Sequence, residues 1–143
     1  MNTILTILFL VGSVSSSILF WRRTPTFFHA NGTLYCGMYK PWCFHVSMFE
    51  TDYPFGDDRI DFFGTRCTSN AYYPYDIKGI QTGDGLWNED YELTMYVSHN
   101  CTRGGDIRRI ERVTKNVPLS DHHVNIVWNV NVADLGEFVD YYA

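Results

Sequence analysis

Four cysteines are the residues whose chemistry most constrains this chain. Cys36, Cys43, Cys67 and Cys101 could bind a metal ion or pair as disulfides. None of them forms a Cys-x-x-Cys motif, and the histidines lie at separations unlike those of zinc sites, so the sequence predicts no metal. In a secreted domain an even number of cysteines indicates disulfides, but spacing alone leaves several pairings open.

The N-terminal segment sets the compartment in which these cysteines would oxidise. An apolar run over Ile4–Val11 is followed by small residues, and Ser15 and Ser17 suit the −3 and −1 positions of a signal peptidase site. The run is too short to span a bilayer about 30 Å thick as a helix. We therefore predict a secretory signal peptide over residues 1–17 and a single secreted, extracellular domain over residues 18–143.

An N-terminal anchor is the alternative interpretation of the same segment. It would continue through Trp21 and stop at Arg22 and Arg23. No second apolar run approaches membrane length, so the rest of the chain is not predicted to span a membrane. The formal net charge is −5, and because phosphate binding depends on clustered Lys and Arg, nucleic acid is not an expected partner.

Two short motifs match the Asn-x-Ser/Thr acceptor of N-linked glycans. They begin at Asn31 and at Asn100. With a secretion signal in front, both are predicted glycosylation sites. Asn100 is the less favoured of the two, because the cysteine inside its motif can be engaged in a disulfide during folding.

The remaining polar residues do not form a recognisable catalytic pattern. His99 is expected to bond a backbone group at a strand end and fix a turn. His122 and His123 are adjacent, so on a strand they would face opposite ways. No nucleophile elbow, phosphate loop or dinucleotide fingerprint occurs, so the sequence predicts neither a catalytic residue nor a cofactor.

Alternation of apolar and polar residues predicts β-strands along most of the chain. The clearest strand is 91–98, in which every second residue is apolar. In 43–50, Phe44, Val46 and Met48 share one face in the same way. The other predicted strands are 32–36, 60–68, 71–77, 107–117 and 124–132.

Turn-forming residues separate these strands and decide the fold class. Segments 52–58 and 79–88 are predicted loops, and Pro74 makes 71–77 an edge strand. Segment 119–123 is long enough for one turn of helix at most. About seven short strands at regular spacing predict an all-β fold, a sandwich of two antiparallel sheets.

Aromatic residues gather in the first half of the chain. Core packing accounts for many of them, but exposed Tyr and Trp are favoured as interface anchors. Tyr72, Tyr73 and Tyr75 are therefore the residues that we predict to contact a partner.

The order of motifs resembles the nematode transthyretin-like family of small secreted proteins. Segment 32–36 is similar to the family's Gly-x-Leu-x-Cys strand, and 46–52 to its Val-x-Leu-Tyr-Glu-x-Asp. Segment 91–101 is similar to its Tyr-Leu-x-Ile-Tyr-His-x-Cys. The chain departs from the family at Cys43 and Cys67, and it lacks the family's C-terminal Asp-Cys.

The resemblance implies a transthyretin-like sandwich with the disulfides Cys36–Cys101 and Cys43–Cys67. It also implies a non-enzymatic binding or signalling protein, whose partner is an extracellular protein, a lipid head group or a small apolar ligand. The alternative is a hydrolase that opens the ring of 5-hydroxyisourate. Such enzymes end in Tyr-Arg-Gly-Ser, whereas this chain ends in Asp140-Tyr141-Tyr142-Ala143. The oligomeric state is not predicted, although exposed sheet edges invite pairing.

Overall fold

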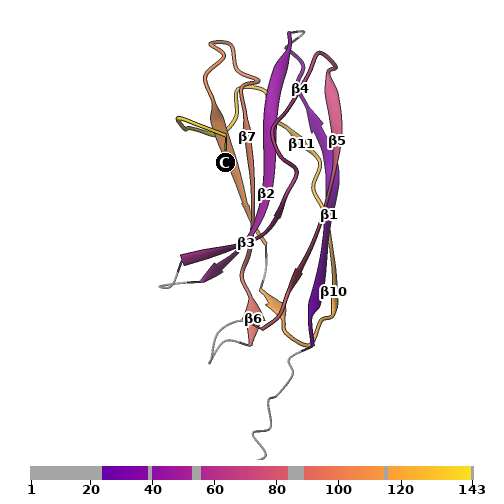
Figure 1. The fold of residues 1–143 in the computed structure, drawn as a ribbon. Coiled ribbons are helices and arrows are strands. Elements are labelled where there is room, and N and C mark those ends of the chain that lie inside the picture. The colour runs from indigo at the N-terminus through magenta and orange to yellow at the C-terminus, as the bar shows by residue number, and fades with distance from the viewer. Residues whose placement is uncertain (1–23, 39, 53–55, 84–88, 115, 143) are drawn as a thin grey trace, which may run out of the picture.

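Two β-sheets face each other in the computed structural model, which describes residues 24–142 except 39, 53–55, 84–88 and 115. Figure 1 shows the sheets side by side, with β1, β5, β10 and β11 in one layer and β2, β3 and β7 in the other. The predicted signal peptide lies outside the described residues. The all-β prediction is confirmed, because the described residues contain strands and no helix.

The strands range from two to eleven residues in length. Their bounds are β1 Thr26–Tyr35, β2 Trp42–Asp52, β3 Gly56–Phe62, β4 Arg66–Thr68, β5 Tyr72–Gln81, β6 Asp90–Tyr91, β7 Leu93–His99, β8 Arg108–Val113, β9 Val117–Pro118, β10 His123–Val127, β11 Val130–Asn131 and β12 Glu137–Phe138.

The six-stranded sheet is antiparallel throughout. Its order is β12-β8-β7-β2-β3, and β4 pairs with the start of β2. The register places Cys43 directly opposite Cys67, and these two cysteines form a disulfide. A second disulfide joins Cys36, after β1, to Cys101, after β7. These are the pairs that the resemblance implied, and each closed loop stabilises the fold by about 2–4 kcal/mol.

The four-stranded sheet differs from the expectation that all strands are antiparallel. Its central strand β1 pairs antiparallel with β5 along one edge. Along the other edge β1 pairs with β10 and then β11, both parallel to it. A parallel neighbour needs a long crossover connection, and here every strand of the second sheet except β12 lies between β1 and β10 in the chain.

The break between β10 and β11 explains a glycine in the centre of β1. The Trp128 carbonyl oxygen lies where a side chain at Gly32 would be, 2.0 Å from an ideal Cβ position. The Trp128 N–H donates to the Asn31 carbonyl, and the Tyr75 hydroxyl donates to the Trp128 carbonyl, both at 2.9 Å. Only glycine therefore allows the chain to approach β1 so closely.

The core forms from the inward residues of both sheets. The predicted faces of β2 and β7 are confirmed, since their inward residues are fully buried: Phe44, Val46, Met48, Leu93, Met95 and Val97. From the opposite sheet Phe28, Leu34 and Ile77 pack against them. Burying each such side chain contributes about 1.5–3 kcal/mol.

Several predicted boundaries were wrong. β1 begins at Thr26, so the predicted strand 32–36 covers only its second half. Asp57 and Asp58 lie in β3, not in a loop, because pairing with β2 continues through them. β5 extends to Gln81, and segment 119–123 contains a turn and no helix. No helix in the described part of the chain is long and apolar enough to cross a membrane.

Candidate functional site: the open face of the four-stranded sheet

The outward side chains of β1, β5 and β10 form a surface that we call the open face. Its residues are Phe27, His29, Asn31, Thr33, Tyr35, Tyr72, Pro74, Asp76, Lys78, Ile80, His123, Asn125 and Val127. Five large apolar or aromatic members are strongly exposed: Phe27 43%, Tyr35 46%, Ile80 56%, Tyr72 58% and Val127 61%. They lie mainly at the two ends of the face, Phe27 and Ile80 at one end and Tyr35 and Tyr72 at the other, with polar side chains between them. Exposed large apolar groups of this kind often mark an interaction site.

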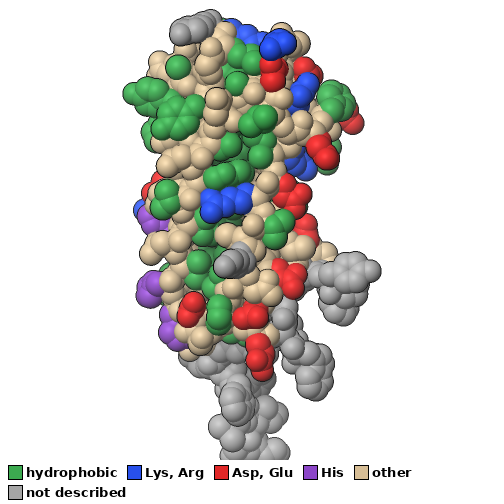
Figure 2. Space-filling model, turned by 180° about the vertical axis from the view of Figure 1, so that it is seen from behind, with side chains coloured by type: hydrophobic (Ala, Val, Ile, Leu, Met, Phe, Trp, Pro, Cys, Tyr) green, Lys and Arg blue, Asp and Glu red, His purple; other side chains and the backbone are tan. Residues whose placement is uncertain are grey.

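A groove of about 460 Å³ lies at the Phe27 end of the open face. Cross-strand pairing places Ile80, Phe27 and His123 in one row. The rings of Phe27 and His123 stack with centroids 5.3 Å apart and planes at 14°. Figure 2 shows histidines gathered at one side of the lower half of the molecule.

A polar group lies directly beside this row. The His29 Nε2–H donates to Asp76 at 2.8 Å, and the Lys78 ammonium lies 3.3 Å from the other Asp76 oxygen. The His29 hydrogen bond, together with Lys78, holds the pKa of the exposed Asp76 carboxyl below its usual value. The aspartate therefore stays ionised and keeps both partners in place.

Both edges of the four-stranded sheet are protected against another strand. On the β5 edge Pro74 has no N–H to donate, and the Lys78 N–H donates to the Asp61 carboxylate at 3.3 Å. On the β10 edge the Arg112 guanidinium donates to the Val127 carbonyl at 2.9 Å and lies over the Trp128 ring. Side chains thus occupy positions that an added strand would need.

The outer face of the six-stranded sheet, which we call the covered face, is built differently. Its central small residues Ser47 and Ser98 are fully buried. Long side chains cover them: Arg59 lies 4.5 Å from the Phe62 ring centre, and Arg109 lies 5.6 Å from that of Tyr96.

His45 belongs to this covered face and is only 8% exposed. Its ring stacks on Phe62 with centroids 5.7 Å apart. Burial, with Arg59 and Arg109 adding to it, lowers the His45 pKa. His45 is therefore neutral at pH 7.

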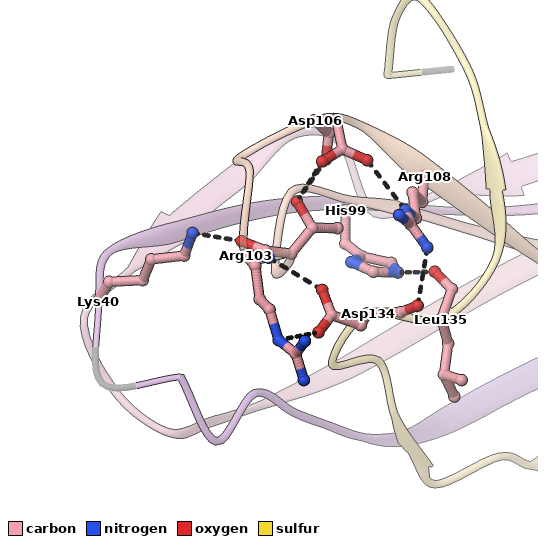
Figure 3. A network of polar contacts seen from close by, with 8 residues as sticks. Lys40, His99, Arg103, Asp106, Arg108, Asp134 and Leu135 are labelled. Carbon is pink, nitrogen blue, oxygen red and sulfur yellow. Dashed lines mark hydrogen bonds and ion pairs between the residues drawn. The ribbon is translucent and has the colours of Figure 1, made fainter.

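A polar network closes one end of the sandwich next to Cys101 (Figure 3). The buried His99 Nε2–H donates to the Leu135 carbonyl at 3.1 Å, the role expected for it. Burial lowers the His99 pKa to about 4, so the ring is neutral. The other contacts are Arg108 to Asp106 and to the Asp134 carbonyl, Arg103 to Asp134, and Lys40 to the Thr102 carbonyl. The network fixes the C-terminal segment and buries the His99 ring.

The three predicted partner-contact residues have different environments. Tyr72 is exposed on the open face and its ring lies 6.5 Å from that of Tyr35. Tyr73 packs against Phe44 and Phe63 at the edge of the core. Tyr75 is 3% exposed, and burial raises the pKa of its hydroxyl. Only Tyr72 of the three presents most of its surface to a partner.

The two glycan motifs also differ in environment. Asn31 is half-buried in the open face, within β1. The Asn100 side-chain oxygen accepts from the Cys43 backbone N–H at 2.6 Å. The Asn100 backbone N–H donates to the Cys43 carbonyl. The Asn100 amide therefore holds β2 against the turn after β7.

The sequence interpretation missed the strand that forms the groove. Residues 26–31 were assigned to no strand, although Phe28 and Ala30 are buried while Phe27 and His29 face outward. The adjacent aromatic residues Phe27 and Phe28 mask this alternation in the sequence. Among the described residues, no group of three His, Cys, Asp or Glu side chains could hold a metal ion.

The fold and the site define a class: a small disulfide-bonded β-sandwich with a ligand-sized groove on one outer face. The chain belongs to a protein family described as Caenorhabditis elegans protein of unknown function (DUF870), whose model matches residues 31–140. It is 38% identical over 78 residues to uncharacterized protein B0416.7 of Caenorhabditis elegans, covering 53% of this chain and 56% of that protein. The chain thus matches little more than half the length of this relative. No solved structure matches it.

Proposed function

We propose that this protein is a secreted, non-enzymatic binding protein of the transthyretin-like class, and that it binds its partner through the open face. The observation that carries the proposal is the row of exposed apolar side chains at the groove, above all Phe27 and Ile80. The partner is an extracellular protein, a lipid head group or a small apolar ligand.

The protected sheet edges favour binding through the face. Pro74 and the Asp61 carboxylate occupy one edge, and Arg112 occupies the other. A partner that added a strand would have to displace these groups, whereas the open face presents apolar side chains without rearrangement.

Two disulfides support an extracellular location, because such bonds persist in oxidising compartments. In this proposal, residues 1–17 are the signal peptide that is cleaved on secretion.

The alternative, a hydrolase on the same fold, needs a base beside a second polar group in a pocket. Two arrangements come nearest to this. His29 is hydrogen-bonded to Asp76 beside the groove at 2.8 Å. His45 and Ser98 are a cross-strand pair, but both are buried and Ser98 accepts from the Arg109 side chain at 3.1 Å. Turnover of 5-hydroxyisourate by the purified protein would favour this alternative.

Secretion is the first part of the test. The full chain is expressed in insect cells, and the protein in the medium is analysed by intact and reduced mass spectrometry. We expect a cleaved N-terminus and no free thiol. Recovery of an uncleaved chain in membranes, with free thiols, would contradict the proposal.

Binding is the second part. The secreted protein and a Phe27→Ala/Ile80→Ser variant are immobilised and exposed to clarified Caenorhabditis elegans extract, and the retained proteins and small molecules are identified. We expect the wild type to retain a component that the variant does not. Equal retention by the two proteins would contradict a role for the open face.

A further inference from the structure

The groove combines an apolar floor with a short polar wall. Phe27 is 43% exposed and Ile80 is 56% exposed, and the His123 ring stacks parallel to the Phe27 ring. The volume of the groove, about 460 Å³, lies within the range of about 300–1,000 Å³ typical of small-molecule pockets. A flat apolar molecule could cover this row and remove it from water.

The charged side chain of the groove wall, Lys78, is paired. Its ammonium lies 3.3 Å from Asp76, which also accepts from His29. A charged ligand would therefore meet groups of both signs and would lose its hydration for little net attraction.

Hydrogen-bonding capacity remains on the wall. Asn125 lies beside His29 across the strand pair and is exposed, and no described residue hydrogen-bonds its side chain. An amide both donates and accepts, and an ammonium has three donors. The wall can therefore bind one uncharged polar group at the end of an apolar body.

We infer that the groove binds an uncharged, mostly apolar small molecule of fused-ring size, which lies over Ile80, Phe27 and His123 and hydrogen-bonds Asn125 and Lys78. This inference rests on the proposed function and names the ligand class of the same face. A lipid head group carries charge and a protein partner would need the whole face, so neither fits the groove as well.

Three probes with the same ring and different charge test the inference. Naphthylmethanol, naphthoate and naphthylmethylammonium are titrated separately into the secreted protein at pH 7, and binding is followed by NMR. The neutral alcohol should bind at least about fivefold more tightly than either ion. Tighter binding of either ion, or no binding of the alcohol at millimolar concentration, would overturn the inference.

Substitutions locate the binding. Phe27→Ala should weaken binding of the alcohol about tenfold or more, and Asn125→Ala about threefold to tenfold. Phe138→Ala removes an exposed aromatic side chain on β12, outside the open face, and should leave binding unchanged. An equal effect of Phe138→Ala and Phe27→Ala would place the probe elsewhere and contradict the inference.

Charge variants supply an independent test. Lys78→Gln leaves the Asp76 carboxylate without its lysine partner and should shift preference toward the ammonium probe by about twofold to fivefold. Asp76→Asn should shift it as far toward naphthoate. If neither variant changes the preference, the wall does not select the ligand by charge.

The two proposals can fail separately. If extract retention depends on Phe27 and Ile80 but no naphthyl probe behaves as stated, the ligand class is wrong and the binding face stands. If the probes bind as stated but the chain is not secreted, the proposed function is wrong and the groove's chemistry stands.

Discussion

Both outer faces of this sandwich carry aromatic and charged side chains, but one face covers its aromatic side chains and the other leaves them exposed. On the covered face, Arg59 and Arg109 lie over aromatic rings, and the serines beneath are fully buried. On the open face Lys78 pairs with Asp76, and Phe27 remains exposed. Aromatic content alone therefore does not identify a binding surface.

The difference comes from where the long cations lie. Arg59 is on β3 and Arg109 on β8, so they extend inward over the face from strands on both sides of β2 and β7. The open face has the same strand spacing but carries its one lysine beside a carboxylate. Its apolar row has no cover from the described residues.

The comparison predicts that an aromatic side chain stabilises the fold only on the covered face. Tyr96 stacks edge-on with Phe49 at 5.7 Å and lies under Arg109. Tyr96→Ala should lower the free energy of unfolding by about 2 kcal/mol, less than for a fully buried aromatic residue. Urea unfolding of the wild type and the variant measures this difference in the free energy of unfolding.

Tyr72→Ala is the matched control on the open face. It should change the free energy of unfolding by less than about 0.5 kcal/mol. Equal losses of unfolding free energy from Tyr96→Ala and Tyr72→Ala would contradict the difference between the two faces.

Ser47 gives a second, smaller test of the covered face. Its hydroxyl is buried and has no hydrogen-bond partner among the described residues. Because a buried unpaired polar group destabilises the fold, Ser47→Ala should raise the free energy of unfolding by about 1 kcal/mol. A loss of stability in urea would show that the hydroxyl has a partner.

Acid should weaken the covered face through His45. Burial lowers the His45 pKa, so the unfolded chain binds this proton at higher pH than the folded chain does. Stability is then fully present above the unfolded pKa of about 6.5 and falls as the pH drops toward the folded pKa.

Urea unfolding at pH 7 and pH 5 measures this dependence. His45→Gln should reduce the loss of stability between the two pH values, whereas His123→Gln on the open face should leave it unchanged. A larger effect of the His123 substitution would contradict the assignment.

The smallest stability effect is expected at the groove itself. The free energy of unfolding of the Phe27→Ala/Ile80→Ser variant should lie within about 0.5 kcal/mol of the wild-type value. The variant should no longer retain the component that the wild type binds from extract. A large loss of stability would mean that these side chains support the sheet.

Much of the fold could be predicted because period-two alternation and burial coincide. Leu93, Met95 and Val97 alternate strictly and are fully buried. The pairing of β10 with β1 could not be predicted, since parallel or antiparallel pairing depends on the path of the whole chain. Residues 26–31 were missed for a local reason, because Phe27 and Phe28 are adjacent and hide the alternation.

The site was harder to predict than the fold. Tyr72, Tyr73 and Tyr75 have the same residue type, but alternation along β5 buries Tyr75 and exposes Tyr72. The groove needs Ile80 and His123 brought beside Phe27 from strands far away in sequence. No spacing within one segment encodes that neighbourhood.

Hydrogen–deuterium exchange on the secreted protein, with and without the component that it retains from extract, tests the central claim most directly. If the component binds the open face, hydrogen exchange should be slower in residues 26–31, 76–81 and 123–127 when it is present, with little change in β7 and β8. Protection confined to β7 and β8 would place the partner on the covered face and contradict the account.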